Sequence, residues 1–197
     1  MAKKLFAITG GIGSGKSSVL SILKDAGHDT LSSDQIVSKL YKTHRVKLLL
    51  KGLFPNAVSG EKRLRINRDE ISKQVFVDKN KHELLTKTIT PLVLDEILKR
   101  AKRTNKPLFV EVPLLFECDY QGYFDNVLVV MRDKNVRIES VKTRSNLTEE
   151  QILARMSNQV DYDKKDLSSY IVIKNDCDII ALKDRVLKLA KELTDVR

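Results

Sequence analysis

The sequence predicts an α/β protein: a five-stranded parallel sheet with helices on both faces. Three observations carry this prediction. Short apolar runs alternate with stretches of helical periodicity, a glycine-rich loop directly follows the first run, and a long helical stretch separates the second run from the third. The runs expected to form strands are Leu5–Thr9, Asp29–Ser33, Leu108–Val112, Asn126–Met131 and Ser169–Ile173.

The loop after the first strand has the phosphate-binding pattern G-x-x-x-x-G-K-[ST]. Residues 10–17 read Gly-Gly-Ile-Gly-Ser-Gly-Lys-Ser. In this motif backbone N–H groups surround phosphate oxygens, Lys16 reaches the β- and γ-phosphates, and the Ser17 hydroxyl ligates Mg²⁺. A glycine-rich turn with a solvated lysine would not account for the strand before the loop or the helix after it. The predicted nucleotide-binding residues of the loop are Gly11, Ile12, Gly13, Ser14, Gly15, Lys16, Ser17 and Ser18.

Helix signals recur between the strands. Asn67 and Thr148 are the expected N-caps of two helices, the second within a capping box closed by Gln151. Pro91 is expected to open a third helix, because proline suits the first helical position. Two further helices are expected to bury apolar faces, made of Val19, Ile22, Leu23 and Ala26 in the first and of Leu182, Val186, Leu189 and Leu193 in the last.

Two stretches are too long to be simple crossovers between parallel strands. Residues 35–106 show only helical patterns and loops, which predicts an inserted helical lobe beside the sheet. Residues 135–165 carry Arg137, Arg144 and Arg155, and an arginine-bearing segment near the end of such a sheet indicates a lid. The segments 1–34, 107–134 and 166–197 form the expected core of a single unit.

Composition narrows the class of partner. The chain has 197 residues, 42% of them hydrophobic, and a net charge of +10, which favours anionic partners such as phosphorylated small molecules or nucleic acid. No apolar run approaches the ~20 residues of a membrane span, and the first residues lack the apolar region of a signal peptide. The two cysteines form no CxxC pair, and the three histidines suggest no zinc site. We therefore expect a cytoplasmic protein with no membrane partner.

Several polar residues stand at the carboxyl ends of the strands, where open α/β sheets bind ligands. Asp34 could accept the proton of an attacking hydroxyl, or it could cap a helix. Glu111 could hold a magnesium-bound water, pair with Lys16 or be a plain edge residue. Asn175 could read a nucleobase edge or lie in a solvated turn. The lid arginines could neutralise a transferring phosphate or be ordinary surface residues.

Several further segments carry a recognisable pattern. The most discriminating are Val112-Pro-Leu-Leu-Phe-Glu117, Arg144-Ser-Asn-Leu-Thr-Glu-Glu-Gln151 and Ala154-Arg155 through Gln159, and the pattern also includes the phosphate loop, Ser32-Ser-Asp-Gln-Ile36, Arg68 through Phe76, Thr90-Pro-Leu92 and Ile173-Lys-Asn175. Together these segments resemble those of the dephospho-CoA kinases, over most of the chain. The resemblance implies a P-loop kinase fold, ATP and Mg²⁺ as co-substrates, and phosphorylation of the ribose 3′-hydroxyl of dephospho-CoA, the final step of coenzyme A synthesis.

The resemblance also implies residue roles. Lys16, Asp34 and Arg144 would be catalytic, with Asp34 facing the acceptor hydroxyl. Arg144 would contact the nucleotide, Asn175 would lie near its adenine, and Ser17 would be the metal ligand. The helical insertion would hold the acceptor, and Arg155 would close over the phosphates with Arg144. The implied acceptor-binding residues are Asp34, Arg68, Leu114, Glu117 and Arg155.

Three positions depart from the family pattern. Ser32 stands where the first acid of an Asp-x-Asp pair is usual, and Thr90 stands where a His-Pro-Leu segment has its histidine. Ser140 stands where the lid usually has the first of two arginines four residues apart, so that only Arg144 remains. No role is carried over to these three positions, and a weaker phosphate clamp is expected of the lid.

Two other functions share these features. A kinase of the same fold could act on a nucleoside monophosphate. A nucleotide-dependent switch module could bind RNA, although Lys174-Asn175-Asp176 is not the NKxD motif that reads guanine. The expected partner is the small-molecule substrate dephospho-CoA rather than nucleic acid, with the protein a monomer or a weak homo-oligomer.

Overall fold

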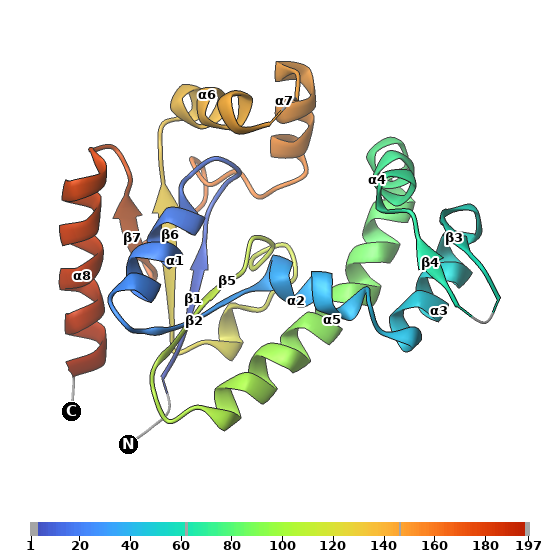
Figure 1. Cartoon of the computed structure of the whole chain (residues 1–197). Coiled ribbons are helices and arrows are strands. Elements are labelled where there is room, and N and C mark those ends of the chain that lie inside the picture. The colour runs from blue at the N-terminus through green and yellow to red at the C-terminus, as the bar shows by residue number, and fades with distance from the viewer. Residues whose placement is uncertain (1–3, 62, 146, 196–197) are drawn as a thin grey trace. The chain divides into compact units, whose positions relative to one another are not determined.

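The computed structural model describes residues 4–61, 63–145 and 147–195. The chain divides into two compact units. The core unit comprises the chain up to Ser32 and from Ala101 onward, and the inserted unit comprises Ser33–Arg100. Figure 1 labels the helices and strands of both units.

The core unit is built on a five-stranded sheet in the order β2-β5-β1-β6-β7. Its neighbouring strands all run parallel, which confirms the predicted sheet. The strand bounds are β1 (Leu5–Thr9), β2 (Asp29–Ser32), β5 (Leu108–Glu111), β6 (Asn126–Met131) and β7 (Ile171–Lys174). The last strand starts two residues later than expected, because the Tyr170 N–H donates to the Leu167 carbonyl in a turn at 3.0 Å.

The helices of the core unit cover the sheet and its carboxyl end. They are α1 (Lys16–Asp25), α6 (Lys134–Arg144), α7 (Glu149–Ser157) and α8 (Ile179–Asp195), with a short 3₁₀ turn at Gln121–Tyr123. Figure 1 shows α6 and α7 on the side of the sheet where β1 and β6 end. The predicted capping box at Thr148 is present at the start of α7.

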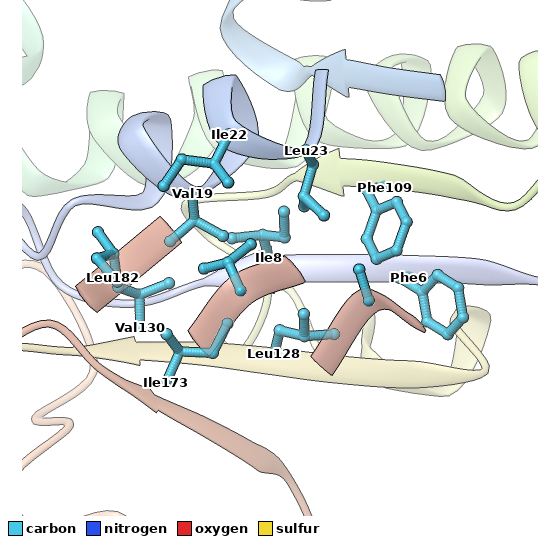
Figure 2. Packing of buried hydrophobic residues seen from close by; sticks show 12 residues of the cluster. Phe6, Ile8, Val19, Ile22, Leu23, Phe109, Leu128, Val130, Ile173 and Leu182 are labelled. Atoms are coloured by element: carbon cyan, nitrogen blue, oxygen red, sulfur yellow. The ribbon is translucent and has the colours of Figure 1, made fainter. Parts of the chain in front are cut away.

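The main hydrophobic core lies between the sheet, α1 and α8 (Figure 2). Central strand β1 is buried along its whole length, and the Phe6 ring stacks on Phe109 with centroids 4.7 Å apart. Val19, Ile22 and Leu23 of α1 are buried as predicted, but Ala26 is not. Ala26 is exposed because it is the C-cap of α1, where the helix has already ended. In α8 the fully buried positions are Leu182, Val186 and Ala190, with Leu189 and Leu193 packed partly against them.

The inserted unit is mostly helical. Its elements are α2 (Ser33–Leu40), α3 (His44–Leu53), a 3₁₀ turn at Pro55–Ala57, β3 (Val58–Ser59), β4 (Arg65–Ile66), α4 (Arg68–Val77) and most of α5 (Lys79–Arg103). The expectation of helices and loops alone was wrong, since β3 and β4 form a small antiparallel pair. Strands of two residues are too short to produce a readable alternation of apolar and polar side chains.

The prediction that Pro91 opens a helix was also wrong, because Pro91 lies inside α5. The helix begins at Lys79, and the Asp78 carboxylate accepts from the N–H groups of Asn80 and Lys81 at 2.9 and 3.2 Å. Proline lacks the N–H that would bond to the carbonyl four residues earlier, so α5 continues through Pro91 without one of its helical hydrogen bonds. The N-cap predicted at Asn67 is confirmed, as its side chain accepts from the Glu70 N–H.

None of the helices in the described ranges is both long enough and apolar enough to cross a membrane.

Candidate active site

The phosphate loop connects β1 to α1 and closes on itself. Lys16 is the first residue of α1, and its Nζ donates to the Gly10 and Gly11 carbonyls at 2.8 and 3.1 Å. The Ser14 N–H donates to the Gly11 carbonyl at 3.1 Å, which tightens the turn. Only 8% of Lys16 is exposed. The loop is therefore preformed around a buried ammonium group at the N-terminus of a helix, where anions are favoured.

Glycine is required at both ends of this loop. Gly10 has φ +143°, and a Cβ there would lie 2.3 Å from the Val130 carbonyl oxygen, which is part of strand β6. Gly15 is the N-cap of α1 with φ +98°, and a Cβ there would lie 2.2 Å from Asn175 Nδ2. Both backbone conformations are ones that only glycine adopts readily. The glycines that define the motif therefore fix the loop against its neighbours.

Asn175 holds the loop from the side of β7. Its backbone N–H donates to the Met131 carbonyl and its Nδ2 donates to the Ser14 carbonyl, both at 2.8 Å. Only 7% of the residue is exposed, so the interpretation of Asn175 as part of a solvated turn was wrong. The strand order explains the burial of Asn175. Strand β6 lies between β1 and β7, so the end of β7 comes close to the loop that follows β1. A contact of Asn175 with adenine stays a prediction.

The predicted lid packs against the tip of the loop. Ile138 and Val141 of α6 and Ile152 of α7 are buried together, and Ile12 of the loop packs on this cluster. The Ile12 N–H donates to Gln159 Oε1 at 2.8 Å. Segment 135–165, the predicted lid, is thus tied to the loop by both apolar and polar contacts. Gln159 belongs to a segment that carried the family resemblance, but sequence reasoning gave it no role.

Arg137 connects α6 to the same loop. Its guanidinium Nη2 lies 3.1 Å from Asp163 Oδ2, and the side chain is 10% exposed. A Cβ on Gly11 would lie 2.3 Å from Arg137 Nη1. The guanidinium therefore lies directly beside the loop backbone.

Tyr162 approaches the end of β1 from the lid. Its hydroxyl lies 3.0 Å from Thr9 Oγ1, and its ring packs on Phe116 with centroids 5.9 Å apart. Burial of the phenol raises the pKa of Tyr162 to about 12; the Thr9 hydrogen bond lowers it and the Glu117 charge raises it. The side chain is therefore neutral at any physiological pH. Nothing in the local sequence indicated this contact.

Glu117 links the turn after β5 to the lid. Its Oε1 accepts from the Val160 N–H at 2.8 Å, while its Oε2 is buried with no hydrogen-bond partner among the described residues. Leu114, in the same turn, is half-buried. Glu111 ends β5, in register with Ile8 and Ser32 on the neighbouring strands. The roles predicted for Glu111, Leu114 and Glu117 stay predictions.

The other two arginines of the predicted lid lie on the surface of the core unit, unlike the buried Arg137. Arg144 is the last residue of α6 and Arg155 lies in the last turn of α7; both are exposed. In the first turn of α1, Ser17 is exposed and Ser18 is half-buried. Contacts of these four side chains with a nucleotide or acceptor stay predictions.

Asp34 and Arg68 belong to the inserted unit. Asp34 is exposed and is the second residue of α2, so the interpretation of Asp34 as a helix N-cap was wrong. Arg68 opens α4, and its guanidinium carbon lies 5.0 Å from the centre of the Tyr41 ring. Burial raises the pKa of Tyr41, although the charge of Arg68 lowers it. The predicted meeting of Asp34 with the phosphate loop stays a prediction.

Comparison with known proteins identifies the family. A family model described as dephospho-CoA kinase matches residues 4–181. The chain belongs to the dephospho-CoA kinase family. The dephospho-CoA kinase of Streptococcus agalactiae serotype III is 30% identical over 196 residues, which cover 96% of this chain and 99% of that protein.

Solved structures agree with the family. A crystal structure from Thermus thermophilus has a TM-score of 0.82 at 31% identity and covers 97% of this chain and 98% of that one. The dephospho-CoA kinase from Campylobacter jejuni has a TM-score of 0.69 at 25% identity, with 97% of each chain covered. A shikimate kinase from Bacteroides thetaiotaomicron has a similar fold, with a TM-score of 0.58 at 8% identity over 98% of this chain and 99% of its own.

Proposed function

We propose that this protein transfers the γ-phosphate of ATP to the ribose 3′-hydroxyl of dephospho-CoA and so produces coenzyme A and ADP. The observation that carries the proposal is the closed phosphate loop, with buried Lys16 at its centre, in a chain that matches the dephospho-CoA kinase family over residues 4–181. The reaction completes coenzyme A synthesis. A cytoplasmic monomer or weak homo-oligomer, free of nucleic acid, is the form in which we expect the enzyme to act.

Lys16 and the loop would stabilise the charge of the transferring phosphoryl group. In-line attack forms a bond between the acceptor oxygen and the γ-phosphorus while the bond to the β,γ-bridging oxygen breaks. The ammonium group of Lys16 and the N-terminal N–H groups of α1 offset the negative charge on the leaving ADP and on the equatorial oxygens. The bonds that Lys16 makes to the Gly10 and Gly11 carbonyls hold it at the loop beforehand.

Asp34 would accept the proton of the attacking 3′-hydroxyl. Its carboxylate is exposed in the first turn of α2 and is thus able to take up a proton from a bound alcohol. General bases contribute about 10²–10⁴-fold to such reactions. The family resemblance supports this role for Asp34, and Ser32, two residues earlier, supplies no second acid.

Ser17 would hold Mg²⁺ at the phosphates. Its hydroxyl is exposed in the first turn of α1, directly after Lys16, where the motif places a metal ligand. One protein oxygen fits this ion, because Mg²⁺ keeps several waters and takes its other ligands from the nucleotide. Mg²⁺ bound there would supply positive charge that offsets the negative charge of the nucleotide phosphates.

The inserted unit would bind the acceptor. Residues 33–100 contain fifteen Lys and Arg and eight Asp and Glu, a net charge of +7 within the +10 of the whole chain. Dephospho-CoA carries a diphosphate, which such a surface attracts. We assign the binding of this diphosphate to Arg68, whose guanidinium lies over the Tyr41 ring. Leu114, Glu117 and Arg155 complete the proposed acceptor-binding set, and Arg144 and Asn175 the nucleotide-binding set.

The test is direct formation of coenzyme A. Purified protein is incubated with Mg-ATP and dephospho-CoA, and coenzyme A and ADP are separated by chromatography. A Lys16→Ala variant is the control, and we expect it to lower kcat by about 10²-fold or more, because it loses a charge aimed at the transition state. A panel of nucleoside monophosphates is run in parallel. Turnover of a monophosphate in place of dephospho-CoA, or no turnover above the Lys16→Ala variant, would reject the proposal.

A further inference from the structure

Two buried cations meet at the phosphate loop. Among the described residues, the charged residues that belong to the buried class are Lys16 and Arg137, each 8% exposed as a whole residue. Lys16 reaches the loop from inside, and Arg137 reaches it from α6. The Lys16 role was predicted from the motif, whereas Arg137 was only one of three arginines in the predicted lid.

The Arg137 guanidinium has fewer partners than a buried cation needs. Its Nη2 meets Asp163, a carboxylate whose side chain is 53% exposed, and its Nε is buried with no hydrogen-bond partner among the described residues. A buried charge is costly unless it is paired and fully hydrogen-bonded. The positive end of the α1 dipole is directed at the same loop. The loop therefore carries an excess of positive charge that a bound anion would balance, and a guanidinium suits a phosphate best because it donates two parallel hydrogen bonds.

The loop sequence makes room for Arg137. A Cβ on Gly11 would lie 2.3 Å from Arg137 Nη1, and a Cβ on Gly13 would lie 2.5 Å from the Arg137 carbonyl oxygen. Both glycines occupy positions that the G-x-x-x-x-G-K-[ST] pattern leaves open. Their small size thus allows the first turns of α6 to lie on the loop backbone.

Arg137 also lies on the correct side of α6 to replace a missing residue. The resemblance to the dephospho-CoA kinases implies two lid arginines four residues apart, and Ser140 stands where the first is expected. Arg137 precedes Ser140 by three residues and Arg144 by seven, so all three share one face of the helix. Position 137 thus carries a cation about one helical turn nearer to the start of α6 than position 140.

We propose that Arg137 is the second phosphate-binding cation of this site and stands in for the arginine missing at position 140. It binds the β- or γ-phosphate of the nucleotide, and Asp163 orients its guanidinium before the nucleotide arrives. The proposal rests on the proposed function only in that ATP occupies the loop; it does not depend on the acceptor.

The test compares four variants with the wild type. Arg137→Gln removes the charge, Arg137→Lys keeps the charge but not the planar fork, and Arg137→Gln with Ser140→Arg restores an arginine at the usual family position. Lys134→Gln is the matched control, because it removes an exposed cation from the start of the same helix. Calorimetry gives the Kd of ATP, ADP and AMP without acceptor, and thermal unfolding reports on the fold.

We expect Arg137→Gln to weaken ATP binding about 10-fold and AMP binding hardly at all, with kcat about 10²-fold lower. Arg137→Lys should fall between Arg137→Gln and the wild type, Lys134→Gln should match the wild type, and Ser140→Arg should recover at least a tenth of the activity lost by Arg137→Gln. A merely structural Arg137 would lower the Tm, weaken all three nucleotides equally and give no rescue by Ser140→Arg, and this result would overturn the proposal. So would wild-type nucleotide binding and kcat in Arg137→Gln.

The experiments distinguish a wrong role for Arg137 from a wrong proposed function. If the wild type forms coenzyme A and Arg137→Gln binds and turns over ATP normally, only the role of Arg137 is lost. If the wild type forms no coenzyme A but binds ATP in a manner that depends on Arg137, the role of Arg137 stands and the acceptor is wrong.

Discussion

At the scale of single residues, the site combines groups of two origins. Lys16 and Ser17 follow from the local motif, whereas Asn175, Tyr162 and Arg137 come from distant parts of the chain. The distant residues are the more buried ones, apart from Lys16. Asn175 bonds to the backbone of the loop and Tyr162 to the Thr9 side chain just before it, so these two residues help to fix the shape of the loop. Lys16 and, in our proposal, Arg137 supply the positive charge that meets the phosphates.

Asp34 is expected to act in catalysis and not in the binding of ATP. We expect Asp34→Asn to lower kcat by about 10²-fold or more, since the amide cannot accept the hydroxyl proton. The Kd of ATP should stay nearly unchanged, because Asp34 lies in α2 and not in the phosphate loop. Steady-state kinetics and calorimetry measure the two quantities. Asp69→Asn, which neutralises an exposed carboxylate of the same unit, is the control. Loss of ATP binding in Asp34→Asn would show that the residue is structural.

Because of Tyr162, the free energy of unfolding should fall as the pH becomes alkaline. Its pKa is raised from 10.0 to about 12 by burial, so the folded protein keeps the phenol neutral where the unfolded chain has ionised it. The contribution to the free energy of unfolding is complete below about pH 10 and is lost between about pH 10 and pH 12, at up to ~1.4 kcal/mol per pH unit. Urea unfolding of the wild type and Tyr162→Phe over this range measures the difference. Equal slopes for the two proteins would contradict the assignment.

At the scale of elements, capping residues and strand pairing determine where the helices and strands begin and end, more than composition does. The Asn67 and Thr148 caps were readable because an acceptor side chain precedes a helical pattern. Pro91 was misread because proline is also tolerated inside a long helix, and the actual start signal was Asp78. The pair β3–β4 was missed because its pairing depends on a partner strand and not on a pattern of its own.

The docking of the lid depends on Gln159. Its Oε1 is the acceptor for the Ile12 N–H, and this N–H is one of those expected to surround phosphate. Gln159→Ala should leave the Ile138–Val141–Ile152 cluster intact but loosen its attachment to the loop. We expect amide hydrogen exchange within residues 135–165 to rise about 5-fold, since one net hydrogen bond is worth ~1 kcal/mol.

Gln151→Ala is the control for that experiment. Gln151 lies on the same segment and caps α7 without contact to the loop. Exchange that rises equally in Gln151→Ala and Gln159→Ala would point to helix fraying, and unchanged exchange in Gln159→Ala would mean that apolar packing alone holds the lid.

At the scale of the whole molecule, charge is distributed unevenly between the two units. The net +7 of residues 33–100 leaves +3 for the rest of the chain, which has almost twice the length. A long-range field of this kind is screened by salt within ~10 Å at 0.1 M. The acceptor, and less so the nucleotide, should therefore bind in a salt-dependent manner.

We expect the KM of dephospho-CoA to rise several-fold between about 0.05 and about 0.5 M KCl, with a smaller change in the KM of ATP. Arg68→Gln should raise the KM of the acceptor about 10-fold at low salt and reduce its salt dependence, with kcat preserved. Lys73→Gln, an exposed cation of the same helix, is the matched control. Equal salt dependence of both substrates would place the acceptor away from the inserted unit.

The sequence by itself determined the parts of this protein that depend on neighbours along the chain. The strand–loop–helix of residues 5–25, the parallel sheet and the caps at Asn67 and Thr148 all follow from spacings of a few residues. Such spacings are set by backbone geometry, which is the same in any protein. They sufficed for the sheet, the phosphate loop and the family.

Only the tertiary structure decided what surrounds the loop. The bonds Ser14–Asn175, Thr9–Tyr162 and Ile12–Gln159 join residues 161, 153 and 147 positions apart. These contacts depend on strand order, which brings β6 and β7 beside β1, and on the return of the chain over the loop through α6 and α7. No periodic pattern spans such distances, because each contact exists only once the elements between its residues have packed.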